Sequence, residues 1–222
     1  VFDQCTKNID ILVTDIISRA NQLQSIKYKP RNVSPSEIIS EDGTRFKEIH
    51  FTIHDDINLV LLELPDKKIN QNAQGFGPIG PIISVVPDAS IEKRFYGEVL
   101  GLELLKDKFF SGRKIETMIG LPPGAGLGLS VWGKQGQMNA LLELVEYSGV
   151  EGSNLFSRAI LPNCGLHSIS FLTTDASKIV NASRAFGSRS VDRGQLGTLC
   201  GDGHYWSVYT PAGMRIDLIN PT

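Results

Sequence analysis

Three acidic side chains recur at equivalent places in apolar segments that are typical of β-strands. Glu63 lies in the run LLELP, Glu143 in LLELV and Asp217 in RIDLI. Carboxylates held on strands bind divalent metals or act as general acids and bases. For Glu143 and Asp217 the alternative is a hydrogen-bonded structural role, because an unpaired buried carboxylate is costly. Their regular recurrence indicates that the chain repeats one structural unit.

Two histidines offer a second candidate site. His50 and His54 lie four residues apart in HFTIH, and a strand would place both on the same face. Imidazoles on one face are suited to metal binding or acid–base chemistry. The interpretation that we favour is a polar outer face of a sheet, because Thr52 lies between them on that face.

Composition excludes several classes of protein. The chain of 222 residues is 41% hydrophobic and 21% charged, which is typical of a globular protein with a substantial core. Its 22 basic and 24 acidic residues lack the basic excess of a nucleic-acid surface, so we expect no nucleic-acid partner. Three widely spaced cysteines favour a reducing, cytoplasmic location. The apolar runs are too short to cross a bilayer, so we expect no membrane partner.

The elements that carry these residues follow the order βαβββ twice. In the module at about 77–148, the strand PIISVVPD and the helix SIEKRFYGEVLGLELL precede the strands RKIETMIGL, GLGLSVWGK and NALLELVEY. In the module at about 163–222, the strand LHSISFLT and the helix DASKIVNASRAFG precede the strands GTLC, HYWSVYT and MRIDLIN. Residues 77–222 are therefore predicted to form one paired-module domain.

Residues 1–70 are predicted to form an incomplete N-terminal βαβββ module, joined by a polar linker at 71–76. Its helix is predicted from an apolar stripe at helical spacing, made by Ile9, Leu12, Val13, Ile16, Ala20 and Leu23. Its first strand is then missing or reduced to Val1–Phe2. A lone module leaves one sheet face uncovered, which predicts pairing with upstream sequence or with a second copy in a homodimer.

A βαβββ repeat that carries FYGEVLGLELL in its helix and an acid on its last strand resembles the glyoxalase / bleomycin-resistance / extradiol dioxygenase group, the vicinal oxygen chelate superfamily. The resemblance is good over residues 77–222 and weak over the first 65. It implies an α+β fold of repeated βαβββ modules, paired to form an open cup-shaped mixed sheet. It also implies that the cup holds a divalent metal (Mg, Mn, Fe, Ni or Zn) and a small-molecule substrate.

The family's metal ligands lie at the start of the first strand and in the middle of the last strand of each module. Glu143 and Asp217 match the last-strand positions. The first-strand positions fall on Pro81, which has no donor atom, and on Ser168, with His167 one residue out of register. Because side chains alternate along a strand, His167 joins the metal ligands only if a bulge turns it to the cup.

The resemblance also implies the residues that contact a ligand. Ser168 and Ser170 share the parity that should face the cup, opposite the apolar Ile169. His204 and Trp206 alternate on the third strand of the last module and are predicted to line the same cup. The competing interpretation is an edge histidine beside a core tryptophan.

Two functions follow from these residues. The loss of ligands at Pro81 and Ser168 favours a protein that binds a small organic molecule in the cup with a degenerate metal site and no metal cofactor, as drug-sequestering relatives do. The alternative is a divalent-metal-dependent lyase, isomerase or ring-cleaving dioxygenase, with Glu143 catalytic and Glu143, Asp217 and His167 holding the metal. A third hypothesis is a catalytically silent domain of a longer enzyme.

Overall fold

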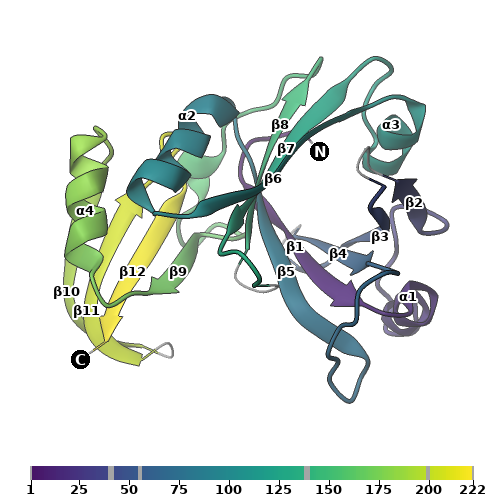
Figure 1. The fold of residues 1–222 in the computed structure, drawn as a ribbon, viewed down its shortest axis with the longest axis horizontal. Coiled ribbons are helices and arrows are strands. Elements are labelled where there is room, and N and C mark those ends of the chain that lie inside the picture. The colour runs from purple at the N-terminus through teal and green to yellow at the C-terminus, as the bar shows by residue number, and fades with distance from the viewer. Residues whose placement is uncertain (1, 40–42, 55–56, 138–140, 199–200, 222) are drawn as a thin grey trace.

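Three complete βαβββ modules make up the computed structural model, which describes residues 2–39, 43–54, 57–137, 141–198 and 201–221 (Figure 1). The first module contains β1 (Thr6–Val13), α1 (Ile16–Ser25), β2 (Ser36–Ile39), β3 (Arg45–Thr52) and β4 (Asn58–Glu63). The second contains β5 (Phe76–Val85), α2 (Ala89–Arg94) with the π-helical turn η2 (Phe95–Val99), β6 (Glu103–Ser111), α3 (Arg113–Ile119), β7 (Gly126–Gly133) and β8 (Leu142–Ser148). The third contains β9 (Ser168–Leu172), α4 (Ala176–Ala185), β10 (Ser190–Thr198), β11 (Gly201–Tyr209) and β12 (Arg215–Pro221), after the short 3₁₀ turn η3 (Phe156–Arg158).

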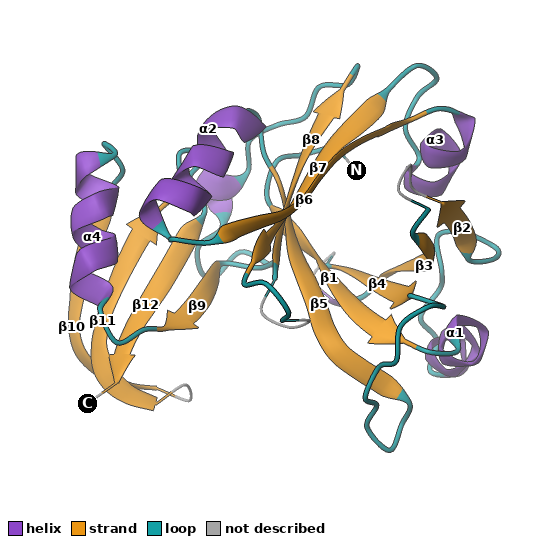
Figure 2. Cartoon of the chain, viewed as in Figure 1, coloured by secondary structure: helices purple, strands orange, loops and turns teal. Residues whose placement is uncertain are grey.

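The sheets pair the modules differently from the sequence prediction. The first two modules share an eight-stranded sheet in the order β2-β3-β4-β1-β5-β8-β7-β6, joined where β1 lies antiparallel to β5. The third module has a four-stranded sheet of its own, in the order β10-β11-β12-β9. The expected cup of the second and third modules is therefore wrong, whereas the α+β class and the cup-shaped mixed sheet are confirmed. Figure 2 shows the larger sheet curling around an interior, with α3 close to β2.

The N-terminal module is complete, because the segment around Ile9–Val13 is a strand and not the start of a helix. β1 lies between β4 and β5, with Asn8, Asp10 and Leu12 lining the cavity and Ile11 and Val13 packed in the cluster that holds α1. Ile9, Leu12 and Val13 also fall at helical spacing, and for that reason the segment was predicted to be helical. The second module now covers this module's sheet, so a homodimer no longer follows from an uncovered face.

Two further differences concern the second module. The segment expected as its second strand, RKIETMIGL, forms α3, which begins after Gly112 and ends at Gly120 with both glycines at positive φ. The strand in its place is β6, whose first residues were expected to belong to the preceding helix. None of the helices in the described ranges is long and apolar enough to span a membrane.

Each module begins its main helix in the same way. The aspartates Asp15, Asp88 and Asp175 are the N-cap residues of α1, α2 and α4, and each side chain accepts a backbone N–H from the first turn. A short acceptor at this position satisfies a donor that the helix itself leaves unpaired. The shared cap is local evidence for the repeat that is independent of sheet pairing.

Separate apolar cores hold the helices on the sheets. α1 packs on β3 and β4 through a cluster that includes Ile16, Leu23, Phe51 and Leu61. A larger cluster joins the outer face of the second module to α4 and the third module, with Phe95 of η2 fully buried in it. The two modules are thus held together through their helices, while the inner face of the eight-stranded sheet stays available to enclose a cavity.

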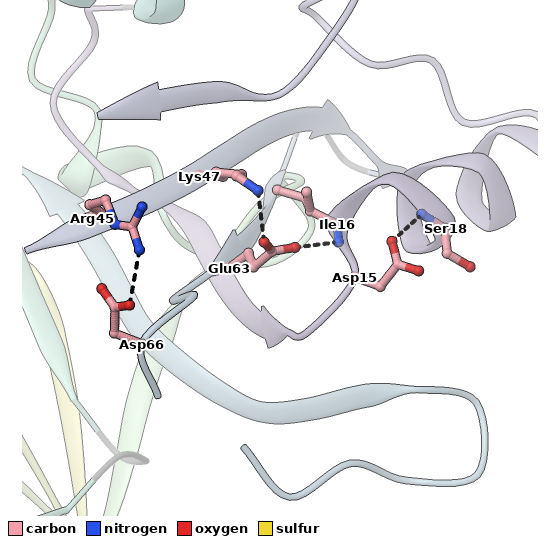
Figure 3. A network of polar contacts seen from close by, with 7 residues as sticks. All are labelled: Asp15, Ile16, Ser18, Arg45, Lys47, Glu63 and Asp66. Atoms are coloured by element: carbon pink, nitrogen blue, oxygen red, sulfur yellow. Dashed lines mark hydrogen bonds and ion pairs between the residues drawn. The ribbon is translucent and has the colours of Figure 1, made fainter. Parts of the chain in front are cut away.

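Glu63 connects β4 to the start of α1 (Figure 3). Its carboxylate accepts the backbone N–H of Ile16 at 2.8 Å and pairs with the ammonium of Lys47 at 3.1 Å. The neighbouring Leu62, and not Glu63, lines the interior of the cup. Glu63 is therefore a structural group on the helix side of the sheet.

We expect Glu63→Ala to lower the free energy of unfolding by about 1–3 kcal/mol, because it leaves the buried Ile16 N–H without an acceptor. Urea unfolding at neutral pH measures this loss. Asp66→Ala removes a carboxylate from an exposed ion pair with Arg45 and should cost well under about 1 kcal/mol. Equal losses in the two variants would contradict the structural role of Glu63.

Candidate functional site

The eight-stranded sheet encloses a cavity of about 340 Å³ between the first and second modules. Its walls are mainly aliphatic and aromatic. The apolar lining includes Leu12, Phe46, Val60, Ile83, Phe110, Leu127, Leu129, Val131 and Val145 from the strands and Ile115, Met118 and Ile119 from α3. A concave, largely apolar space with a few polar groups is the usual form of a small-molecule site.

Two acids form the polar part of the cavity floor. Asp10 on β1 is 6% exposed and Glu143 on β8 is 8% exposed, and both line the cavity. β5 lies between their strands, with Ile83 paired to Glu143 and the small Gly80 packed against Asp10. Among the described residues, no hydrogen-bond partner reaches Oδ1 of Asp10. The floor therefore presents a polar atom that the protein itself leaves unsatisfied.

Burial and nearby negative charges raise the pKa of both acids. Burial is the main cause that raises the pKa of Glu143 to about 8, and the nearby Glu48 raises it further against the opposing effect of Lys106. Burial, followed by the charges of Glu143 and Glu48, holds the pKa of Asp10 well above its ordinary value. At neutral pH Glu143 is therefore mainly a neutral carboxylic acid that can donate a hydrogen bond, and the pKa of Asp10 is raised in the same direction.

Glu48 and His50 extend the polar floor onto β3. Nε2 of His50 lies 3.1 Å from a carboxylate oxygen of Glu48, and both side chains line the cavity. The interpretation of His50 as part of a polar outer face is wrong, because β3 turns that face toward the second module. His54 lies beyond the end of β3 and packs edge-to-face on Tyr28, so the two histidines do not share a site.

Cationic side chains border the cavity on several sides. Lys7 and Arg31 lie at one end, while Lys67 and Lys106 belong to other parts of the lining. The ammonium of Lys106 lies 5.5 Å from the ring centroid of Phe46. Because Lys106 is on the edge strand β6 and Phe46 is on β3, next to the other edge strand β2, this contact brings the two sides of the curled sheet together.

The predicted residues of the third module lie elsewhere. Ser170 and Asp217 are register partners on β9 and β12 of the four-stranded sheet, and Asp217 accepts a hydrogen bond from Ser207 and pairs with Arg215. Ser168 accepts a hydrogen bond from the same arginine. Glu143 and Asp217, which the metal hypothesis brings together, thus lie in different sheets.

The structure also separates the predicted ligand-binding residues within that module. Trp206 packs against the helix-side cluster, with the guanidinium of Arg184 5.6 Å from its ring, and His204 lies beside it. Ser168 and Ser170 occupy the opposite face, as the alternation with Ile169 predicted. The four residues therefore do not line one cup, because Trp206 belongs to the core that holds α4.

His167 shows no sign of metal ligation. It precedes β9, and its Nε2 lies 2.6 Å from the carbonyl oxygen of Asn163. Across the described ranges, no group of three or more His, Cys, Asp or Glu side chains is arranged to hold a metal ion. In the cup itself, Pro81 lines the wall without a donor atom, and the described side chains Asp10, Glu48, His50 and Glu143 do not form such a group. The donor set does not fit the metal that the family resemblance implies.

Sequence reasoning missed Asp10, Glu48 and the interior position of His50. Asp10 lies in a segment that was predicted to be helical. The alternation of Asn8, Asp10 and Leu12, all of which line the cavity, was the available signal. Glu48 and His50 alternate on β3 in the same way, but which face is interior depends on a partner module far along the chain.

Solved structures share this fold. Glyoxalase I from Zea mays matches with a TM-score of 0.67 and 15% identity, over 99% of this chain and 68% of that one. A putative dioxygenase from Bacillus subtilis matches with a TM-score of 0.55 and 10% identity, over 99% and 63% of the two chains. A glyoxalase family protein from Bacillus cereus matches with a TM-score of 0.52 and 15% identity, over 69% and 95%.

These likenesses define the chain's fold as that of the vicinal oxygen chelate proteins, and they confirm the family resemblance at the level of the fold. No family model and no curated protein matches the chain. At 10–15% identity these three matches show the fold alone, and the chemistry has to be inferred from the residues of the cup.

Proposed function

We propose that this protein binds a small organic molecule in the cup between its first and second modules, and that it does so without a metal. The observation that carries this proposal is the cavity of about 340 Å³, which combines apolar walls with the buried acids Asp10 and Glu143. Burial of acids without a compensating ion is unfavourable for folding. A ligand that accepts hydrogen bonds from them supplies the missing partner.

The positions of the proposed metal ligands do not favour the alternative of a metal-dependent enzyme. It requires Glu143 and Asp217 to meet at one ion, whereas they belong to different sheets and Asp217 already has Ser207 and Arg215 as partners. We therefore propose no lyase, isomerase or dioxygenase chemistry for this chain. A cytoplasmic location and a homodimer stay predictions of the sequence.

A bulky side chain placed in the cup should weaken the binding of an apolar ligand. We expect the neutral solvatochromic dye Nile red to bind the wild-type protein, and Val131→Trp to weaken that binding by at least about tenfold, because Val131 lines the cavity wall. Fluorescence titration measures the affinity, and circular dichroism confirms folding of the variant. Val33→Trp is the matched control, because Val33 is fully exposed. Absence of dye binding by the wild type, or equal binding by both variants, would overturn the proposal.

A further inference from the structure

We infer that the cup selects organic acids: small molecules with an apolar body and an anionic oxygen head group. This inference rests on the proposed function and specifies its ligand class. Three features carry it, namely the cations around the cavity, the position of Lys106 relative to Glu143, and the buried acids of the floor, where Oδ1 of Asp10 has no hydrogen-bond partner among the described residues.

The charge of the lining favours an anion. Four basic side chains, Lys7, Arg31, Lys67 and Lys106, line the cavity within the described ranges. The carboxyl groups that line it are Asp10, Glu48 and Glu143, which the basic side chains outnumber, and burial raises the pKa of Asp10 and of Glu143 and so reduces their negative charge. Charges in a space of low dielectric act more strongly than in water, so the excess positive charge attracts an anionic ligand.

Lys106 and Glu143 are placed to contact the same ligand head group. Both residues are register partners of Val131, Lys106 from β6 on one side and Glu143 from β8 on the other. Their backbones are thus two strand spacings apart, about 10 Å, with both side chains on the interior face. A carboxylate above Val131 can accept a hydrogen bond from the acid and pair with the ammonium.

The floor acids suit an acceptor better than a donor. Burial raises the pKa of Asp10 and of Glu143, and the charge of the nearby Glu48 raises both further, because buried like charges do not all ionise. The resulting O–H groups donate to an anionic oxygen, which gives short and strong hydrogen bonds. A ligand amine would instead require these acids to ionise and would lie among the four lining cations.

The same arrangement makes binding depend on pH. As the pH rises through about 8, Glu143 loses its proton and changes from a donor into a repulsive anion. The described titratable or charged groups that face it or lie along the same cavity are Asp10, Glu48, His50, Lys106, Tyr147, Lys7, Arg31 and Lys67. We therefore expect acid binding to weaken between pH 7 and pH 9.

Three probes that share one body test the inference by isothermal titration calorimetry: 4-phenylbutanoic acid, 4-phenylbutanamide and 4-phenylbutylamine. At pH 7 we expect the acid to bind about tenfold more tightly than the amide, and the amine most weakly. Three results would overturn the organic-acid inference and leave the proposed function standing. They are an amine that binds more tightly than the acid, equal affinities for the acid and the amide, and no acid binding by a protein that still binds Nile red. A protein that binds neither dye nor acid overturns both.

Two variants locate the head group. Lys106→Gln should weaken acid binding about five- to tenfold and leave amide binding unchanged, whereas Lys134→Gln, at an exposed position, should change neither. Glu143→Gln should retain acid binding at pH 7 and abolish its loss at pH 9, because an amide donates at both values. Equal effects at Lys106 and Lys134, or an unchanged pH dependence in Glu143→Gln, would overturn this placement.

Discussion

Replacing Phe95 by alanine is expected to lower the free energy of unfolding by about 3–5 kcal/mol, which is the usual cost of removing a buried aromatic ring. Phe95 is fully buried in the cluster between the second and third modules. Its ring packs edge-to-face on Phe186, just beyond the end of α4, with the centroids 5.6 Å apart. The substitution therefore removes apolar contacts on both sides of the module interface. Urea unfolding followed by circular dichroism measures the loss.

Phe109 provides the matched control for this variant. It lies on β6 and is 61% exposed, so Phe109→Ala should change the stability by less than about 1 kcal/mol. Similar losses in the two alanine variants would show that the ring at position 95 does not hold the modules together in the way the structure indicates.

Glu143→Gln is expected to stabilise the protein by about 2–4 kcal/mol at pH 8, and by much less at pH 5. The pKa of this side chain is about 8 in the folded protein, against an ordinary value of 4.5. Between these two values the unfolded chain has released the proton while the folded protein still holds it. Raising the pH through this range therefore favours unfolding of the wild type, at about 1.4 kcal/mol for each unit of pKa difference. Glutamine does not titrate, so the variant does not lose this stability as the pH rises.

Chemical unfolding at the two pH values measures this effect. Glu151→Gln is the control, because Glu151 is exposed, and its stability difference from the wild type should be small and independent of pH. The burial argument fails if Glu143→Gln gains the same stability at pH 5 as at pH 8, or if it is less stable than the wild type at pH 8.

Local signals in the sequence were sufficient to identify the repeating unit. The caps Asp88 and Asp175, each followed by apolar residues at helical spacing, start their helices where the pattern predicts. The alternation along β9 places Ile169 in the core and Ser170 on the opposite face, as expected. These features depend on residues close together in the chain, and for that reason a single sequence reveals them.

The partners of each module were not predictable in this way. β1 was predicted as helix because Ile9, Leu12 and Val13 fall at helical spacing, whereas the alternation of Asn8, Asp10 and Leu12 is that of a strand. The pairing of β1 with β4 and β5 shows that the strand is correct. Once β1 was misplaced, the first module lost its strand, and the cup was assigned to the wrong pair of modules.

The composition of the candidate site depended on that pairing. The sequence by itself determined that Glu143 lies in a strand of a glyoxalase-like module, and this residue does line the cup. The tertiary structure decided that its neighbours are Asp10, Glu48 and His50, while Asp217 lies in a separate sheet. The physical reason is that the alternation of side chains along a strand is a local property. Which strand lies across the cup depends instead on how whole sheet faces are buried against each other, and no short segment of sequence encodes that.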